Sequence, residues 1–306
     1  MSAIMRKYLP KLFIQQWIVG VSRANMADII RKKAFTADID WIPAENAAML
    51  YADPFLYRSN DGIAILFEDY SMHDNYGKIS VIKTGEGMNR AHHKVVLDTR
   101  SHLSYPFVFS ENGDTYLFPE ASQSGKLSVY RFDTATANAT YLQDILELPL
   151  LDGTIHKHNG TYWLFGTING PEADSKMHLF YASSLFGPYK AHPANPVREG
   201  IQGSRPAGRI VEVDGQLYRP AQNSMYAYGE SITINRIKTL NEQEYAEEVH
   251  MVIEIDKKNP RNRKMHGIHT INHIDDVIVV DGTVWRFSPA LKWKQVKRKM
   301  AAKRNQ

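Results

Sequence analysis

The chain has 306 residues, of which 43% are apolar, and this is enough for a substantial hydrophobic core. It contains no cysteine, which excludes disulfide bonds and any zinc or iron–sulfur site with cysteine ligands. The formal net charge is +4, but residues 291–306 contain seven basic residues and no acid, so the rest of the chain is near −3.

Residues 1–42 are predicted to form an N-terminal segment that is partly helical. Residues 24–34 contain good helix formers with Met26, Ile29 and Ile30 at helical spacing, and we place this helix on the outside of the main domain. Polar residues such as Lys11 interrupt the apolar residues of positions 1–20, and no stretch approaches the length of a membrane span. We therefore expect a cytoplasmic protein, with a location at the periphery of a membrane as the alternative.

Residues 43–290 repeat one pattern at intervals of roughly 50 residues. Each copy has an apolar run, a turn with glycine and a second apolar run, which is the pattern of a β-hairpin. The predicted turns are Asp61-Gly62, Asn112-Gly113, Asn159-Gly160, Asp214-Gly215 and Asp281-Gly282. Five copies with this period predict an all-β fold, a five-bladed β-propeller. Residues 13–21, rich in β-branched and aromatic side chains, are expected to add an outer strand to the short last blade and close the ring.

Residues 291–306 are predicted to be a basic C-terminal tail. Such a tail is either simply solvated or attracted to an anionic membrane surface or another polyanion. Trp293 among the lysines favours the membrane alternative slightly.

The copies keep their apolar residues but differ in their polar ones, which suggests one scaffold that presents different chemistry around a shared axis. Asp53, Glu120 and Asp152 come from three different copies and are our candidate catalytic residues. They could serve as a general base, a general acid and a third group that tunes or orients, as glycoside chemistry requires. The alternatives are a turn or capping aspartate at Asp53 and half of a structural ion pair at Glu120.

A second set of polar residues is predicted to bind substrate. Arg205, Arg219 and Gln222 suit sugar oxygens or an anionic group, since guanidinium makes paired hydrogen bonds to planar oxyanions. The alternative is that they neutralise the candidate carboxylates. Glu230 and His269 complete the predicted binding set.

No cofactor, metal or nucleic-acid partner is expected. His266, His269 and His273 lie close together, but no second cluster has metal-ligand spacing. The usual glycine-rich nucleotide loops, the Gly-x-Ser-x-Gly elbow and the interleaved basic and aromatic residues of nucleic-acid-binding modules are all missing from the sequence.

Several of these motifs resemble the N-terminal propeller domain of plant glucosamine inositolphosphorylceramide transferases and its bacterial relatives. The resemblance covers roughly residues 40–290 and is carried by Ala52-Asp53-Pro54-Phe55, Phe118-Pro119-Glu120-Ala121, Leu151-Asp152-Gly153-Thr154, Ser204-Arg205-Pro206-Ala207-Gly208, Leu217-Tyr218-Arg219-Pro220-Ala221-Gln222 and Gly267-Ile268-His269-Thr270. In bacteria it implies an association with formyltransferase-like and polysaccharide-biosynthesis proteins.

More distantly, Asp53 and Asp152 are similar to the base and third-carboxylate positions of five-bladed arabinanase- and invertase-like glycoside hydrolases. Those hydrolases place the acid in a later blade, whereas Glu120 lies in the second copy. We therefore expect a hydrolase-like or glycosyl-transferring propeller that acts on a surface glycan or glycolipid in polysaccharide biosynthesis. The alternative is a non-catalytic glycan-binding module that positions substrate for a partner transferase or formyltransferase.

Overall fold

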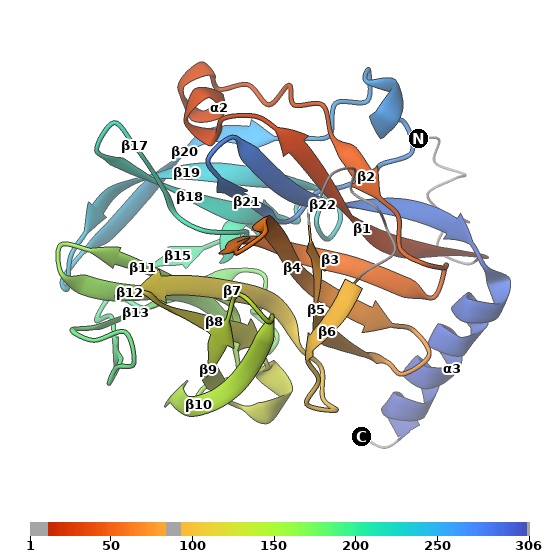
Figure 1. Ribbon diagram of the computed structural model, residues 1–306, viewed down its shortest axis with the longest axis horizontal. Coiled ribbons are helices and arrows are strands. Elements are labelled where there is room, and N and C mark those ends of the chain that lie inside the picture. The colour runs from red at the N-terminus through yellow and green to blue at the C-terminus, as the bar shows by residue number, and fades with distance from the viewer. Residues whose placement is uncertain (1–11, 84–92, 305–306) are drawn as a thin grey trace.

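The computed structural model describes residues 12–83 and 93–304. Five antiparallel sheets are arranged around a common centre (Figure 1), which confirms the predicted five-bladed β-propeller.

The first three blades follow the chain from the inner strand outward. Blade 1 contains β3 (Met49–Ser59), β4 (Gly62–Ser71), β5 (Tyr76–Lys83) and β6 (His93–Leu97). Blade 2 contains β7 (Ser104–Glu111), β8 (Asp114–Glu120), β9 (Leu127–Asp133) and β10 (Asn138–Leu146), with a 3-10 turn η1 (Ser122–Ser124) between β8 and β9. Blade 3 contains β11 (Leu150–His158), β12 (Thr161–Ile168) and β13 (Lys176–Ala182), with β14 (Lys190–Ala191) and β15 (Arg198–Glu199) both paired with β13.

The last two blades depart from this simple order. In blade 4, the inner strand is split into β16 (Gln202–Pro206) and β17 (Val211–Val213), followed by β18 (Gln216–Asn223), β19 (Ser231–Leu240) and β20 (Tyr245–Ile253). A second 3-10 turn, η2 (Pro260–Asn262), leads to blade 5. Blade 5 combines β21 (Ile271–Ile274) and β22 (Val277–Phe287) with β1 (Phe13–Arg23) and β2 (Asp40–Ile42).

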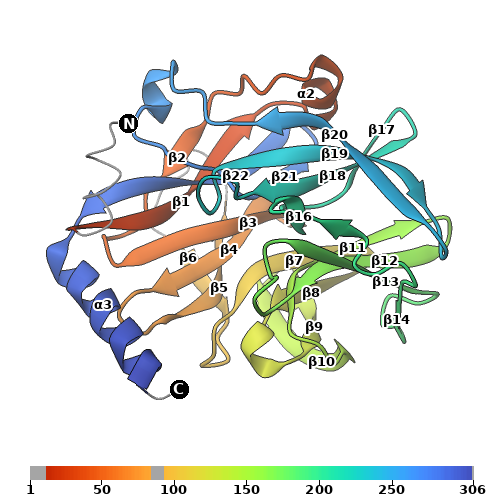
Figure 2. The same cartoon turned by 180° about the vertical axis from the view of Figure 1, so that it is seen from behind.

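The pairing of β1 with β22 closes the ring (Figure 2). Phe13 lies opposite Phe287 and Arg23 lies opposite Val277, so the two strands match along their whole length. This confirms the outer strand predicted over residues 13–21. The first and the last strand of the described chain are therefore joined in one sheet.

Hairpin turns explain why the repeat was visible in the sequence. At Asn112-Gly113, Asn159-Gly160 and Asp214-Gly215 both central residues have positive φ, between 48° and 87°, as type I′ turns require. The turn predicted at Asp281-Gly282 is wrong, because both residues lie inside β22. The hairpin turn of blade 5 is at Asp275-Asp276 instead.

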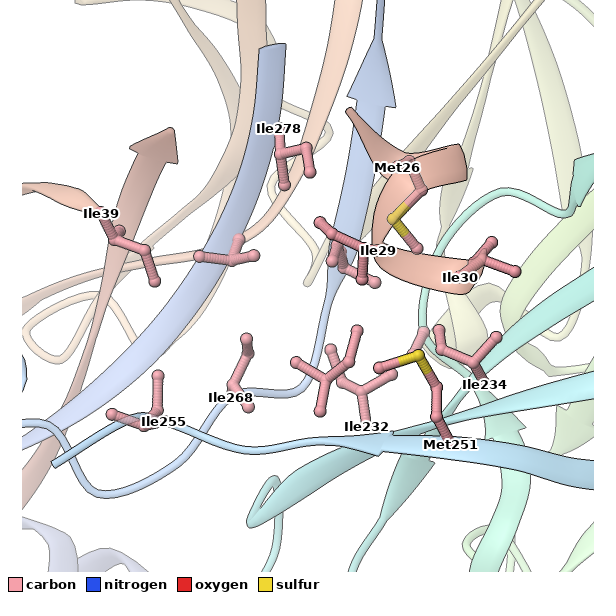
Figure 3. Close-up of a cluster of buried hydrophobic side chains, with 14 of the residues drawn as sticks. Met26, Ile29, Ile30, Ile39, Ile232, Ile234, Met251, Ile255, Ile268 and Ile278 are labelled. Carbon is pink, nitrogen blue, oxygen red and sulfur yellow. The ribbon is translucent and has the colours of Figure 1, made fainter. Parts of the chain in front are cut away.

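Helix α2 (Met26–Lys32) confirms the predicted N-terminal helix. The side chain of Asn25 caps it by accepting a hydrogen bond from the backbone N–H of Asp28. Its apolar face packs onto strands of blades 4 and 5 (Figure 3), in one buried cluster that includes Met26, Ile29, Ile30, Ile232, Ile234, Met251, Ile268 and Ile278. The helix thus covers the junction between these two blades.

The predicted C-terminal tail is instead largely helical, since α3 spans Pro289–Arg304. Alanine, leucine, lysine, arginine, glutamine and methionine favour helix, and proline is tolerated at the first helical position. Figures 1 and 2 show α3 at the outside of the ring, beside the ends of β1 and β22. Among the described residues, no helix is long and apolar enough to cross a membrane.

Candidate functional site

A distinctive residue occupies one equivalent point in each blade, on the inner strand in blades 1 to 4 and just before it in blade 5. From blade 1 to blade 5 these residues are Asp53, Tyr105, Asp152, Arg205 and His269. Asp53, Tyr105 and Asp152 have φ values of 48°, 42° and 51°, and each coincides with a register shift in its strand. Positive φ is uncommon for residues other than glycine, and such strain at a bulge often marks a functional position.

A second set of side chains lies on the neighbouring strand of each blade. Glu68 on β4 and Glu120 on β8 lie opposite Ala52 and Ser104, the residues just before Asp53 and Tyr105. In blade 5, the backbone N–H of Asp281 donates to the carbonyl of Thr270 at 3.3 Å. Thr167 on β12 and Gln222 on β18 hold comparable places in blades 3 and 4. The first and second sets together form the polar ring.

Much of the polar ring borders a cavity of about 250 Å³. Its wall contains acidic, basic and aromatic side chains, namely Asp53, Glu68, Glu120, Arg205, His102, His269, Trp17, Tyr70 and Tyr228, with Leu50, Ala52 and Ser104 completing it. This mixture of carboxylic acids, cations and stacking surfaces in one concave place makes it the candidate functional site.

Asp53, His269 and Asp281 form the tightest part of the site. Asp281 Oδ2 accepts a hydrogen bond from Asp53 N at 2.9 Å, and Asp281 Oδ1 accepts from His269 N and Thr270 N, each at 3.0 Å. His269 Nδ1 lies 2.6 Å from Asp281 Oδ2, and His269 Nε2 lies 3.4 Å from Asp53 Oδ1. Thr270 Oγ1 donates to Asp53 Oδ1 at 2.9 Å. The buried Asp281 therefore holds both the backbone and the imidazole that surround Asp53.

This arrangement shifts the pKa values of both Asp53 and His269. Burial raises the pKa of Asp53 to about 6, although the nearby His269 opposes the shift. Burial lowers the pKa of His269, but the carboxylates of Asp281 and Asp53 outweigh it, so that the pKa of His269 is raised overall. At pH 7, Asp53 is therefore mainly ionised.

Glu120 has the opposite protonation state. Burial, together with the carboxylate of Asp152, raises the pKa of Glu120 to about 8, although Arg205 opposes the shift. Glu120 is thus mainly protonated at pH 7. Burial and the carboxylates of Asp53 and Glu120 also raise the pKa of Glu68 well above its ordinary value. The cavity consequently presents an ionised and a protonated carboxyl group at the same pH.

Asp152 lies behind this wall and is strongly engaged. Arg205 Nε donates to Asp152 Oδ2 at 2.5 Å, and Gln222 Nε2 donates to the same oxygen at 2.8 Å. Asp152 N donates to Glu120 Oε2 at 3.2 Å. Asp152 is 1% exposed. Its position links Arg205 to Glu120 and leaves little of its carboxylate accessible to a ligand.

The aromatic side of the cavity is built around Trp17. Its indole stacks on His269 with ring centroids 3.9 Å apart, and Tyr228 meets both rings edge-on. The guanidinium of Arg205 lies 5.7 Å from the centre of the Tyr228 ring. These flat surfaces could stack on a sugar ring or another planar or apolar face of a ligand.

Two residues of the predicted binding set, Arg219 and Glu230, lie outside the cavity wall. Arg219 is fully buried, and its Nε donates to Glu247 Oε2 at 2.9 Å in an ion pair within blade 4. Glu230 accepts a hydrogen bond from Tyr226 N within its own loop and does not line the cavity. Arg205 and His269 line the cavity. Gln222 does not line it, but donates a hydrogen bond to Asp152 behind the wall.

Sequence reasoning missed Tyr105, Asp281 and Trp17. Strict alignment of the five copies would have drawn attention to Tyr105 and Asp281, because they occupy the same places as Asp53 and Glu68. The hydroxyl of Tyr105 accepts from Gly208 N and shares a hydrogen bond with Thr154 Oγ1, both at 2.8 Å, so it ties three blades together. No local signal identified Trp17, which reaches the cavity from the strand that closes the ring.

Asp53, His269 and Asp281 also place potential metal-ligand atoms within 4.8 Å of one another. Hydrogen bonds from three backbone N–H groups already occupy the carboxylate of Asp281. The expectation that the protein needs no metal stays a prediction.

Comparison with solved structures supports the architecture. A family 117 glycoside hydrolase, Zg3597 from Zobellia galactanivorans, matches with a TM-score of 0.55 and 13% identity, covering 91% of this chain and 92% of that one. A thermostable family-43 glycoside hydrolase matches with a TM-score of 0.51 and 14% identity, covering 69% of this chain and 81% of that one. At these identities the likeness concerns the fold alone.

Sequence comparison is more specific. Glucosamine inositolphosphorylceramide transferase 1 of Arabidopsis thaliana is 36% identical over 214 residues, which are 68% of this chain and 28% of the transferase. The protein of the same name from Oryza sativa subsp. japonica is 32% identical over 230 residues, 73% of this chain and 31% of that one. This chain thus spans less than a third of the length of these transferases. Residues 37–285 match the family model described as glucosamine inositolphosphorylceramide transferase 1, N-terminal, and the chain belongs to that family.

Proposed function

We propose that this propeller is a carbohydrate-active domain that performs acid–base chemistry on a glycan or glycolipid, by hydrolysis or glycosyl transfer. We place this activity in the synthesis of a surface polysaccharide or glycolipid. The name of its relatives, glucosamine inositolphosphorylceramide transferase 1, supports a glycolipid substrate.

One observation carries the proposal, namely that Asp53 and Glu120 border the same cavity with pKa values on opposite sides of 7. Glycosyl chemistry requires a carboxylate that acts as a base or nucleophile and a protonated acid that assists the leaving group. In this proposal Asp53 has the first role and Glu120 the second. Asp152 acts as the third group, because it contacts Glu120 through its backbone and anchors Arg205.

Substrate recognition falls to the remaining cavity wall. Trp17 and Tyr228 offer stacking surfaces to a sugar ring, and Arg205 offers a cation to a hydroxyl or an anionic substituent. Burial raises the pKa of Glu68, which favours a protonated carboxyl group that can donate a hydrogen bond to a sugar oxygen.

Product formation tests the proposal. Wild-type protein, Asp53→Asn and Glu120→Gln would each be incubated with glycolipids and polysaccharides of the source cell, with and without nucleotide sugars, and the products analysed by mass spectrometry and NMR. We expect sugar release or transfer by the wild type and a loss of about 10²-fold or more in each variant. Equal turnover by wild type and both variants would refute the assigned roles.

A second candidate is a glycan-binding module without turnover, and the internal pairing of the ring favours it. Asp152 is held by Arg205 and Gln222, and Asp53 accepts from Thr270, so several polar groups already have partners. In that case the wild type would retain one glycan fraction without changing it. Asp53→Asn and Glu120→Gln would then alter affinity only.

A further inference from the structure

We propose that α3 docks on an anionic lipid bilayer and thereby brings the neighbouring cavity to the sugar of a membrane lipid. The docking surface consists of Trp293, Lys297 and Met300, and it belongs to a helix whose sequence is strongly basic. The identity of the lipid-linked sugar as the ligand rests on the proposed function, whereas the docking itself does not.

The helix has two distinct faces. Leu291, Gln295 and Arg298 follow one another at intervals of four and three residues and face the propeller. Leu291 packs against the apolar cluster around Met72, and Arg298 donates to the carbonyl of Met72 at 2.7 Å. The inner face therefore fixes the helix to blade 1.

Trp293, Lys297 and Met300 have the same spacing on roughly the opposite side of the helix. Trp293 is 60% exposed and Met300 is 57% exposed. Lys297 Nζ lies 5.6 Å from the centre of the Trp293 ring. An exposed tryptophan with a flanking lysine is typical of side chains at a membrane–water interface.

The charge of the helix selects an anionic partner. Residues 289–304 contain seven lysines and arginines and no acidic residue. The rest of the chain is near −3, so the positive charge is concentrated on this one element. Phe287, just before the helix, is 65% exposed and adds apolar surface next to the basic residues. Basic charge combined with exposed apolar side chains fits an anionic bilayer better than a purely polar polyanion.

The inner face of α3 is also connected to the cavity. Tyr70, in the cavity wall, donates from its hydroxyl to Asn75 Oδ1 at 3.2 Å. Arg298 Nη1 donates to the same oxygen at 3.1 Å. Leu50, another wall residue, packs in the cluster that contains Leu291. One end of the cavity is therefore in contact with the helix through shared partners.

These contacts allow an estimate of the distance between the cavity and the bilayer surface. An α-helix with its side chains is about 10–12 Å thick. If the outer face of α3 lies on the bilayer, the Leu50 and Tyr70 end of the cavity is about that far from the lipid surface. This is within reach of a sugar carried on a lipid headgroup, so docking would present such a sugar without extracting the lipid.

Vesicle sedimentation tests the docking directly. The 306-residue chain would be mixed with phosphatidylcholine vesicles, with and without phosphatidylglycerol, at low and high salt. We expect binding only to the anionic vesicles, and weaker binding at high salt. Trp293→Ala combined with Lys297→Glu should bind at least about 25-fold more weakly, since the lysine reversal alone removes two unit charges worth about fivefold each. The matched control, Tyr141→Ala combined with Lys190→Glu, changes an exposed aromatic residue and an exposed lysine in blades 2 and 3 and should bind like the wild type.

The outcomes separate this proposal from the proposed function. Absence of anionic vesicle binding by the wild type, or equal binding by the α3 variant, would overturn the docking even if a soluble glycan is turned over. Retention on RNA or on an acidic protein, without vesicle binding, would assign the basic surface to another partner and would also overturn it. If docking holds, the α3 variant should lose turnover of a vesicle-embedded glycolipid while keeping turnover of the detached sugar headgroup. Vesicle binding without any turnover would instead count against the catalytic function alone.

Discussion

Replacement of Asp281 by asparagine should destabilise the protein severely. The carboxylate of Asp281 is fully buried and accepts hydrogen bonds from the backbone N–H groups of Asp53, His269 and Thr270. An asparagine side chain has the same shape but only one accepting oxygen. In one orientation its NH₂ group faces Asp53 N, and in the other it faces His269 N and Thr270 N, so at least one buried donor loses its acceptor.

The expected size of this effect follows from the contacts. A hydrogen bond to a charged group contributes about 1.5–3 kcal/mol, and the substitution also removes the negative charge 2.6 Å from His269 Nδ1. Breaking a buried ionic contact by changing one partner typically costs about 3–5 kcal/mol. We therefore expect Asp281→Asn to lower the free energy of unfolding by about 3–5 kcal/mol.

Urea unfolding at pH 7, followed by tryptophan fluorescence, measures this loss. Asp276→Asn is the matched control, because Asp276 is exposed and pairs with Arg23, which is also exposed. The control should change the free energy of unfolding by less than about 1 kcal/mol. A loss below about 1 kcal/mol for Asp281→Asn would refute the conclusion that this carboxylate organises the site.

Three further predictions concern charged residues. Because the pKa of Glu120 is raised to about 8, protonation of Glu120 stabilises the folded protein fully below the ordinary pKa of 4.5, and this stabilisation is lost as the pH rises through about 8. Urea titrations of Glu120→Gln should therefore show a smaller decline of the free energy of unfolding between pH 5 and pH 8 than those of the wild type. If Asp53 and Glu120 are base and acid, turnover should fall below about pH 6 and above about pH 8, and a flat pH profile would contradict those roles. Arg219→Met leaves Glu247 buried with a weaker set of partners, so it should lower the free energy of unfolding by about 3–5 kcal/mol in thermal or urea unfolding. Glycan affinity should stay within about twofold in calorimetry, and a larger loss of affinity would indicate that Arg219 binds the ligand.

The fold could be predicted because the turns that separate its strands are specified by short local sequences. An Asn-Gly or Asp-Gly pair between two apolar runs has few structural solutions, and its recurrence at a constant interval implies a repeated hairpin. The same reasoning failed at Asp281-Gly282, where the pair is not a turn. Asp281 accepts hydrogen bonds from buried backbone N–H groups such as that of Asp53. Gly282 is needed inside the strand because a side chain there would collide with Trp41 and Met265. The sequence alone cannot distinguish an aspartate that ends a strand from one that is required inside it.

The site was partly predictable for a similar reason. Asp53, Glu120, Arg205 and His269 could be located because the start or end of a propeller strand faces the central axis. Arg219 could not be excluded by composition, but the alternation of β18 separates it from Gln222, since residues three apart on a strand point to opposite faces. The pKa differences depend on burial and on charges from other blades, and no spacing within one repeat contains that information.

The backbone at the ring is independent of the chemistry that it presents. The same positive φ occurs at Asp53, Tyr105 and Asp152, although one side chain borders the cavity as an acid, one ties blades together through its hydroxyl, and one anchors a guanidinium. The strained bend is therefore a property of the repeated strand and its bulge. Blades 1 to 3 each supply this bend separately, whereas the side chains on it are tied to neighbouring blades, as Asp152 is to Arg205. The chemistry of this propeller is thus decided by a few side chains at equivalent points, held by a backbone that the repeat itself provides.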